Sequence, residues 1–317
     1  MNLPKLAFFK NQYVPYSEAK IGVLTHAFNY GTAVFGGIRG YWNSEEEQLF
    51  VFRPIDHFQR FLNSARLLLM ELNQTPESLT DITLELLNQE GYREDIYIRP
   101  IAYKSDEIIG VRCHDLHDEF TIVAIPFDRY IKNDTDVHAT FSSWRRIDDN
   151  VIPARGKISG AYANSAVIKT DAARAGFDEA LVLTQDGHVS EGSAMNIFIV
   201  REGVVITPPV TDNILEGITR KSAIELLFKE QGVQVVERSI DRTEVYLCEE
   251  CFMTGSAAQI IAVTSVDRRP IGKGVMGPIT SKLRTTFNDV IRGRVAKYRR
   301  WTMPVYHEVA EVNLRTC

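Results

Sequence analysis

The feature that most constrains the fold is a pair of strand-forming runs near the N-terminus with a helix directly after them. Residues 33–42 and 48–53 are rich in apolar, β-branched and aromatic side chains, and a polar stretch, 43–47, separates them. Two such runs joined by a longer loop predict a β-hairpin. Pro54 suits the first turn of a helix, and apolar residues then recur at helical spacing as far as about Met70. Consecutive strands followed by a helix favour an α+β unit with an antiparallel sheet.

The same kinds of pattern continue along the 317 residues and predict two domains. Because segment 128–136 is polar and poor in strand signals, we expect a small N-terminal domain over 1–127, a linker over 128–137 and a larger C-terminal domain over 138–317. The further helices expected are 78–89, 161–175, 219–230 and 279–295. The further strands expected are 95–103, 120–127, 138–144, 179–184, 196–200, 204–207, 233–239, 251–254 and 260–266.

Composition narrows the class of protein. Hydrophobic residues make up 44% and charged residues 24% of the chain, as in ordinary globular proteins. The net charge is −5 and no basic run occurs, which argues against nucleic acid as a partner. No apolar run approaches ~18 residues, so no membrane span is expected. The first ten residues lack the pattern of an export signal, and we therefore expect a cytoplasmic protein.

The cysteines do not indicate a redox or metal site. Four cysteines in a chain of this length make no disulfide framework. Cys248 and Cys251 form a C-x-x-C pair, which in other settings is redox-active or binds metal. Because no second pair and no histidine at zinc spacing accompanies it, we expect a structural role and no metal.

The segment from Ala154 to Tyr162 points to chemistry. It places Lys157 between Gly156 and Gly160, with small residues around it. Glycine lets the backbone come close to a ligand, and a lysine in such a setting can lose its proton and attack a carbonyl group. A lysine in a surface turn is the plainer reading of this segment on its own. Three later segments strengthen the catalytic reading.

Those segments answer the other requirements of pyridoxal phosphate. This cofactor needs a lysine for its aldehyde, an anion site for its phosphate and an acid at its ring nitrogen. Glu191 lies among small residues after an expected strand and is the candidate acid. Ile218 and Thr219 open an expected helix, whose free N–H groups would bind phosphate, and Ser256 follows an apolar strand and adds a second hydroxyl. No dinucleotide-binding, P-loop or nucleophile-elbow motif competes with this reading.

Order, spacing and residue type together resemble the fold-type IV pyridoxal-phosphate enzymes, and most closely the branched-chain amino acid aminotransferases. The resemblance runs from about Leu24 to Pro278. The matching motifs are His26-Ala27-Phe28-Asn29-Tyr30-Gly31-Thr32-Ala33-Val34-Phe35 through Arg39, His57-Phe58-Gln59-Arg60, Tyr97-Ile98-Arg99-Pro100, Lys157 with Tyr162, Glu191, Leu215-Glu216-Gly217-Ile218-Thr219-Arg220 and Phe252-Met253-Thr254-Gly255-Ser256-Ala257-Ala258. The resemblance implies a two-domain fold like that of D-amino acid aminotransferase, in which the larger domain forms a pseudo-barrel of strands.

The resemblance also implies a role for each matching residue. Lys157 would hold the cofactor as a Schiff base, Tyr162 would lie near its ring hydroxyl and Glu191 would meet its ring nitrogen. The phosphate would be bound by Arg60, Thr219, Ser256 and the N–H of Ile218. The substrate pocket would be formed by Phe35, Tyr97, Arg99, Tyr130 and the N–H of Ala257, with Tyr30 and Val111 reaching in from the partner of a homodimer that could assemble further.

The expected activity is transfer of the amino group of leucine, isoleucine or valine to 2-oxoglutarate. Within the fold type, a D-amino acid transaminase, an (R)-amine transaminase or aminodeoxychorismate lyase would keep Lys157 and Glu191, and a cofactor-binding protein without turnover is a further alternative. The chain departs from the family at Gly36, where a glutamate is usual, and at Ser256, where threonine is usual. The first difference removes a carboxylate that the family has next to its substrate pocket.

Overall fold

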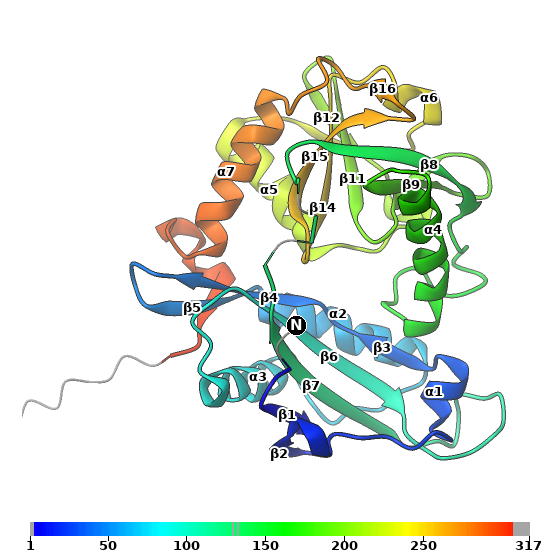
Figure 1. Cartoon of the computed structure of the whole chain (residues 1–317), viewed down its shortest axis with the longest axis vertical. Coiled ribbons are helices and arrows are strands. Elements are labelled where there is room, and N and C mark those ends of the chain that lie inside the picture. The colour runs from blue at the N-terminus through cyan, green and yellow to red at the C-terminus, as the bar shows by residue number, and fades with distance from the viewer. Residues whose placement is uncertain (1–2, 129, 132, 307–317) are drawn as a thin grey trace, which may run out of the picture.

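The computed structural model describes residues 3–128, 130–131 and 133–306, which form two β-sheets flanked by helices. The first sheet and its helices occupy the lower half of Figure 1 and the second sheet the upper half. Within these residues, no helix is both long enough and apolar enough to cross a bilayer.

The first sheet has eight strands, and every neighbouring pair is antiparallel, as the consecutive strand signals predict. Its order is β17-β5-β4-β6-β7-β1-β2, with β3 paired to β6. The strands are β1 (Leu6–Phe9), β2 (Gln12–Pro15), β3 (Ala33–Phe35), β4 (Ile38–Asn43), β5 (Gln48–Phe52), β6 (Ile96–Lys104), β7 (Asp118–Pro126) and β17 (Thr302–Pro304). Helices α2 (Pro54–Leu67) and α3 (Pro76–Glu90) pack on it through Phe58, Phe61, Leu79 and Leu86. The short helix α1 (His26–Tyr30) precedes β3.

The predicted hairpin forms between β4 and β5, but its first run is two strands and not one. The break falls at Gly36 and Gly37, where the N–H of Gly36 donates to the carbonyl of Pro100. A Cβ at Gly37 would lie 2.3 Å from the hydroxyl of Tyr97, so only glycine fits there without displacing that ring. The break turns Phe35 and Gly37 toward the cavity described below.

The second sheet has nine strands in the order β10-β9-β8-β15-β14-β11-β12-β13, with β16 paired to β15, and it curls into a half-barrel. Only the pairs β8–β9, β8–β15 and β12–β13 are parallel. The strands are β8 (Val137–Arg145), β9 (Glu179–Leu183), β10 (Val189–Gly192), β11 (Asn196–Arg201), β12 (Val204–Thr207), β13 (Val235–Glu237), β14 (Glu250–Gly255), β15 (Gln259–Val266) and β16 (Arg269–Pro270). Its helices are α4 (Tyr162–Arg174), α5 (Ile218–Gln231), α6 (Arg242–Val245) and α7 (Pro278–Ile291).

Several helix ends differ from the predicted ones for local reasons. Helix α3 begins two residues before the predicted Ser78, because Thr75 and Ser78 form a reciprocal capping box. Helix α7 ends at Ile291 and not near Val295, because Gly293 takes a left-handed conformation with φ of 72°. The apolar periodicity does not mark either kind of end, because capping contacts and left-handed glycines set where a helix begins and stops.

The chain returns to the first sheet at its C-terminal side. After α7, β17 pairs antiparallel with β5, and the backbone N–H of Arg53 donates to the carbonyl of Trp301 at 2.6 Å. The guanidinium of Arg53 stacks on the ring of Trp301 and donates to the hydroxyl of Ser222 on α5 at 2.8 Å. These contacts tie the first sheet to the helix that forms one end of the site. The division into domains at 128–137 stays a prediction.

Candidate active site

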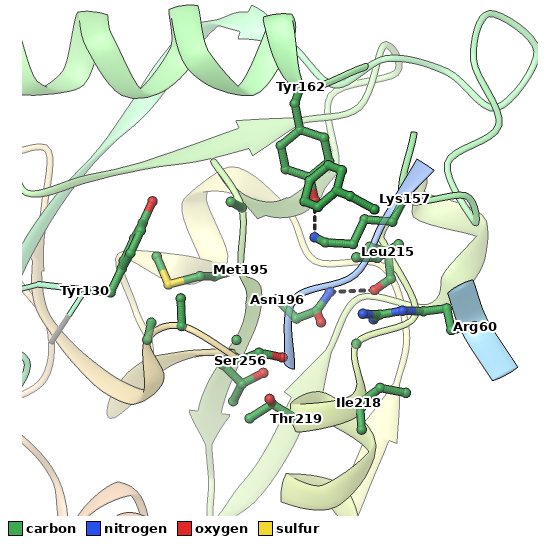
Figure 2. A pocket seen from close by; sticks show the side chains of 18 of the residues that line it. Arg60, Tyr130, Lys157, Tyr162, Met195, Asn196, Leu215, Ile218, Thr219 and Ser256 are labelled. Atoms are coloured by element: carbon green, nitrogen blue, oxygen red, sulfur yellow. Dashed lines mark hydrogen bonds between the residues drawn. The ribbon is translucent and has the colours of Figure 1, made fainter. Parts of the chain in front are cut away.

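A cavity of about 450 Å³ lies between the two sheets. It is lined from the first sheet by residues of β3, β6 and α2, and from the second by β10, the start of α5 and the turn after β14. Every candidate residue except two lines this cavity: Phe35, Arg60, Tyr97, Arg99, Tyr130, Lys157, Tyr162, Glu191, Ile218, Thr219, Ser256 and Ala257. Segments far apart in the sequence therefore meet at one place, and Figure 2 shows the side chains that line it.

Lys157 projects into the cavity from the loop between β8 and α4. Its N–H donates to the hydroxyl of Ser64 at 3.1 Å, and its carbonyl accepts the N–H of Phe35 at 3.0 Å. Its amino group is hydrogen-bonded to the hydroxyl of Tyr162, as the dashed line in Figure 2 shows, and lies 4.7 Å from the ring centroid of Phe35. The backbone at Lys157 is thus held by the first sheet, which fixes where the amine points.

The glycines on either side of Lys157 do not bring the backbone close to a ligand, as the sequence predicted they would; they allow close packing within the protein. A Cβ at Gly156 would lie 2.9 Å from a methyl carbon of Leu67, and one at Gly160 would lie 3.3 Å from the carbonyl oxygen of Gly31. Neither glycine lines the cavity. The glycines let the lysine loop pack closely against α2 and the end of α1, so their effect on the site is indirect.

The surroundings of Lys157 favour a neutral amine. Burial holds the pKa of Lys157 well below its usual range, and the nearby guanidinium groups of Arg60 and Arg99 lower it further, while Glu191 opposes them. Removing an ammonium from water and placing like charges beside it both disfavour the charged form. A neutral lysine at ordinary pH is a nucleophile for a carbonyl group and a base for a carbon-bound proton.

Glu191 lies on β10 at a register shift against β9, which turns its carboxylate into the interior. One oxygen accepts the N–H of Leu215 at 3.1 Å and the amide of Asn196 at 3.2 Å. The other forms an ion pair with Arg146 at 3.0 Å. Burial raises the pKa of Glu191, whereas Arg146 and the N–H of Leu215 act in the opposite direction. This is a buried carboxylate with donors on both oxygens.

A candidate anion site lies at the opposite side of the cavity from Tyr162. Helix α5 begins after Gly217 with no side chain capping its first N–H groups. Free N–H groups at a helix start attract phosphate. In Figure 2, Arg60, Ile218, Thr219 and Ser256 lie on the same side of Lys157. Arg60 is held there by a hydrogen bond of 3.1 Å to the carbonyl of Glu216.

These residues fit pyridoxal phosphate. Buried polar groups normally have a hydrogen-bond partner, yet the hydroxyl of Thr254, on a residue 1% exposed, lines the cavity without one. An uncapped helix start and the Arg60 guanidinium offer unsatisfied donors nearby. The cavity therefore offers the amine of Lys157 for the cofactor's aldehyde, the carboxylate of Glu191 for its ring nitrogen and the start of α5 for its phosphate.

The rest of the cavity wall is largely apolar, with one cation. Phe35, Ile101 and Met195 supply apolar surface, and Tyr97 and Tyr130 add aromatic rings. Arg99 lies over the ring of Phe35 at 4.5 Å and donates to the hydroxyl of Tyr97 at 3.0 Å. Its Nε is buried without a partner, and no carboxylate pairs with Arg99 in the part of the chain that the structure describes.

Two candidates lie outside this cavity. The hydroxyl of Tyr30 accepts the N–H of Gly110 at 3.1 Å, and Val111 is 87% exposed on the same loop. Both were predicted to enter the site of a partner chain, and that stays a prediction. Gly36, where the family usually has glutamate, also misses the cavity, since it lies in the turn beside Pro100.

Sequence reasoning gave no role to several residues that shape the site, although Arg39 ends one of the matching motifs. Arg146 pairs with Glu191, and Asn196 joins Glu191 to the carbonyl of Leu215. Arg39, only 2% exposed, donates to the carbonyls of Phe127, Asp128 and Ala257 and so ties the predicted linker to the turn after β14. A buried strand position occupied by arginine or asparagine is the signal that could have found Arg39 and Asn196.

The C-x-x-C pair lies in the core of the second sheet and not at the cavity. Burial raises the pKa of the Cys248 thiol to about 12 and that of the Cys251 thiol well above its usual range. Thiols held in the protonated form are poor nucleophiles. Over the described residues, no cluster of side chains suited to hold a metal ion occurs.

Comparison with known proteins identifies the family. Residues 34–266 match amino-transferase class IV. The chain belongs to this family. It is 48% identical over 300 residues to the probable branched-chain-amino-acid aminotransferase of Aquifex aeolicus (strain VF5), covering 95% of this chain and 96% of that protein. It is 34% identical over 298 residues to the branched-chain-amino-acid aminotransferase of Escherichia coli (strain K12), covering 93% and 95% of the two chains.

Solved structures agree with the family and the fold. The branched-chain aminotransferase of the archaeon Thermoproteus uzoniensis with norvaline superposes with a TM-score of 0.91 at 40% identity, over 96% of this chain and all (100%) of that one. The enzyme from Thermobaculum terrenum in its pyridoxal phosphate form gives a TM-score of 0.91 at 38% identity, over 97% and 100% of the chains. The predicted fold-type IV architecture and the resemblance are confirmed, and class IV membership makes pyridoxal phosphate the cofactor of this aminotransferase.

Proposed function

We propose that this aminotransferase moves the amino group of leucine, isoleucine or valine to 2-oxoglutarate. The observation that carries the proposal is the cavity itself, which places one low-pKa lysine, one buried carboxylate and an anion site around an apolar pocket that holds a single cation, Arg99. The apolar surface suits a branched aliphatic side chain, and the guanidinium suits the second carboxylate of glutamate. The relatives' names, which are those of branched-chain aminotransferases, favour the same substrates.

In this proposal each residue around the cofactor has a separate role in the reaction. When bound, pyridoxal phosphate supplies a ring that draws electrons from the bonds at the amino acid's α-carbon. Lys157 holds the cofactor and moves a proton between two carbons, which requires a base within reach of both. Glu191 holds a proton at the ring nitrogen, and Tyr162 orients the lysine amine. The N–H of Ala257 faces the substrate carboxylate.

The phosphate is assigned to the corner around the start of α5. Arg60, Thr219, Ser256 and the N–H of Ile218 are its partners in this proposal, and all line the same part of the cavity. Thr254 adds a hydroxyl that has no partner within the chain. Serine at 256 keeps the hydroxyl that threonine would supply, so phosphate binding does not depend on that difference.

A substrate screen tests the proposal. Purified protein is incubated with pyridoxal phosphate, 2-oxoglutarate and each of L-leucine, L-isoleucine, L-valine, D-alanine and an (R)-amine, and the chirality of the glutamate formed is measured. We expect L-glutamate with the branched-chain amino acids. Turnover only of the D-amino acid or the (R)-amine, or release of pyruvate in a separate incubation with aminodeoxychorismate, would assign another activity of the same fold type. If the protein binds the cofactor but turns over none of these substrates, it is a cofactor-binding protein and not an enzyme.

Arg99 should matter far more for glutamate than for leucine. One pocket has to accept an aliphatic side chain in one half-reaction and a carboxylate in the other, and an unpaired carboxylate in an apolar site is costly. In Arg99→Met, the glutamate half-reaction is expected to lose about 2–4 kcal/mol of transition-state binding, and the leucine half-reaction much less. Stopped-flow absorbance of each half-reaction separates the two.

The leucine half-reaction is the internal control for Arg99→Met. Equal losses in both half-reactions would mean that Arg99 supports the fold or the α-carboxylate, because both substrates share that group. An Arg66→Met variant, which removes an exposed arginine of α2, should leave both half-reactions unchanged.

We further propose that the enzyme works as a homodimer in the cytoplasm, in amino-acid biosynthesis. Exposed apolar side chains gather around α1 and the loop that contains Gly110. The ring of His26, on α1, is hydrogen-bonded through Nε2 to the carbonyl of Gly110 at 2.8 Å and so holds this loop beside the helix. Val23 is 78%, Phe28 70%, Ile109 65% and Val111 87% exposed. Contiguous apolar surface of this kind marks protein interfaces, and covering it would bring Tyr30 and Val111 toward a partner's cavity.

Phe28→Asp is expected to convert the dimer to a monomer, because a carboxylate at a buried interface loses hydration without gaining a partner. Light scattering after size-exclusion chromatography measures the mass, and activity should fall with it. Phe228→Asp is the matched control, since Phe228 is 67% exposed on α5, outside this patch. A dimer that persists in Phe28→Asp but not in Phe228→Asp would place the interface elsewhere.

A further inference from the structure

Behind the acid of the site lies a second charged residue that does not line the cavity. Arg146 follows the last residue of β8, and its guanidinium forms an ion pair with the carboxylate of Glu191 at 3.0 Å. The side chains of Arg146 and Glu191 are 12% and 5% exposed, so this pair is largely removed from water. Arg146 is absent from the cavity wall, so Glu191 is its direct link to a bound molecule, although its charge also acts on the pKa of Lys157 and of Tyr162.

The chain holds Arg146 from several sides. Its Nε donates to the carbonyl of Asn213 at 3.0 Å, and its backbone N–H donates to the carbonyl of Leu183 at 2.9 Å. Its own carbonyl accepts the amide of Gln185 at 3.1 Å. Asn213 presents its carbonyl from a left-handed conformation with φ of 58°. A planar guanidinium whose Nε is held by a carbonyl is a directional partner for the carboxylate that meets its terminal nitrogen, which a flexible surface arginine is not.

The other contacts of Glu191 favour its ionised form over its protonated form less strongly than Arg146 does. Asn196 and the N–H of Leu215 are neutral donors, and both reach the same oxygen, whereas Arg146 meets the other oxygen with a full charge. Lys157 and Arg60 also lower the pKa of Glu191, but among the described residues only Arg146 forms an ion pair with its carboxylate. Burial alone would favour the neutral acid. Arg146 is therefore the contact that opposes the effect of burial most strongly and favours the ionised form of Glu191.

We propose that Arg146 is a positioning residue that keeps Glu191 ionised, so that the proton shared between this carboxylate and the cofactor's ring nitrogen stays on the nitrogen. This inference rests on the proposed function, since it requires pyridoxal phosphate in the cavity with its ring nitrogen at Glu191. A protonated ring nitrogen draws electrons from the reacting carbon, whereas a neutral nitrogen facing a neutral carboxylic acid does so less. Removing Arg146 moves the proton toward Glu191 without changing the number of protons in the pair.

The test follows the ring nitrogen directly. Holoenzyme is prepared with pyridoxal phosphate labelled with ¹⁵N at the ring nitrogen, and its ¹⁵N resonance is measured at one fixed neutral pH for wild type, Arg146→Met and Arg145→Met. In Arg146→Met we expect the resonance to move toward the value of an unprotonated pyridine, with kcat reduced roughly 10-fold to 100-fold, as when other outer partners of a ligand-contacting group are removed. A wild-type resonance in Arg146→Met overturns the inference, whatever happens to kcat.

Arg145 is the matched control. It is the neighbouring residue, carries the same charge and is exposed, so Arg145→Met loses one positive charge without touching Glu191. Its resonance and rate should match wild type. If both variants move the resonance equally, the effect comes from net charge and not from the contact of Arg146 with Glu191, and the inference fails.

A charge-conserving variant covers the case in which Arg146→Met does not hold the cofactor. Arg146→Lys keeps a cation near Glu191 but loses the hydrogen bond to Asn213, and we expect a protonated ring nitrogen with partly restored turnover. An unprotonated nitrogen in Arg146→Lys would overturn the role of the charge. Failure of the proposed function would look different, because wild type itself would then lack bound pyridoxal phosphate or transaminase activity.

Discussion

Replacing Lys157 with alanine is expected to abolish transamination, by a factor of at least about 10⁴, while the protein stays folded. The amine of Lys157 serves as both the attachment point of the cofactor and the base that moves a carbon-bound proton, and each role alone contributes about 10²–10⁴ in rate. Within the described residues, its amino group contacts the side chains of Tyr162 and Phe35, both of which line the cavity, so we expect its loss to leave the packing between the sheets intact. Steady-state rates with leucine and 2-oxoglutarate, with a melting curve beside them, measure both effects.

Borohydride reduction identifies the attachment point independently of activity. Wild-type holoenzyme should lose its visible absorption on reduction, and peptide mapping should find the cofactor on Lys157. Lys157→Ala should bind pyridoxal phosphate reversibly, with nothing retained after reduction and dialysis, and added alkylamines should restore part of its activity. Lys229→Ala, which removes a lysine 47% exposed on α5, should behave as wild type. An adduct on any lysine other than Lys157 would contradict the assignment.

The low pKa of Lys157 gives a further expectation for the binding step. Because burial and two neighbouring guanidiniums lower this pKa, the amine is deprotonated at pH values where an ordinary lysine is charged. Capture of pyridoxal phosphate by the apoprotein should therefore be fast at neutral pH and should slow as the pH falls through the lowered pKa.

The sequence predicted those parts of the site that lie within short segments. Lys157, Glu191, Thr219 and Ser256 each carry a local signal, such as small neighbours, a helix start or the end of an apolar strand. Their meeting in one cavity came from the resemblance to the aminotransferase family, because no periodicity says which loops converge. The main strands and helices were also predictable, because apolar residues recur every 2 residues in a strand and every 3.6 residues in a helix.

What the sequence did not disclose depends on contacts between distant segments. Arg146 reads as one of two adjacent arginines, and only the pairing of β8 with β9 and of β9 with β10 brings it to Glu191. Likewise, the apolar run 33–42 continues through Gly36 and Gly37 without a gap in its pattern, and the break there comes from the approach of Tyr97 and Pro100 on β6. Strand β17 is similarly defined by its neighbour β5 more than by its own residues.

Glu191→Gln is expected to keep the cofactor bound but to lower turnover by about 10²–10⁴, the range for groups that stabilise developing charge in a reaction. The amide has nearly the shape of the carboxylate and can still accept the N–H of Leu215, so the pocket keeps its form. It cannot carry the negative charge that holds a proton on the ring nitrogen. The charge of Arg146 then has no counter-ion, and stability should fall as well, since an unpaired buried charge is costly.

The matched control separates the charge at the ring from general effects near the cavity. Glu216 lies beside Arg60, but its carboxylate is 54% exposed and faces Arg155, so Glu216→Gln removes one negative charge without altering the ring nitrogen's partner. We expect its kcat within about twofold of wild type, because exposed pairs of this kind contribute little. Equal losses in both variants would point to the net charge of the cavity. Near-normal turnover in Glu191→Gln with cofactor bound would mean that another group protonates the ring, and the positioning role proposed for Arg146 would fail with it.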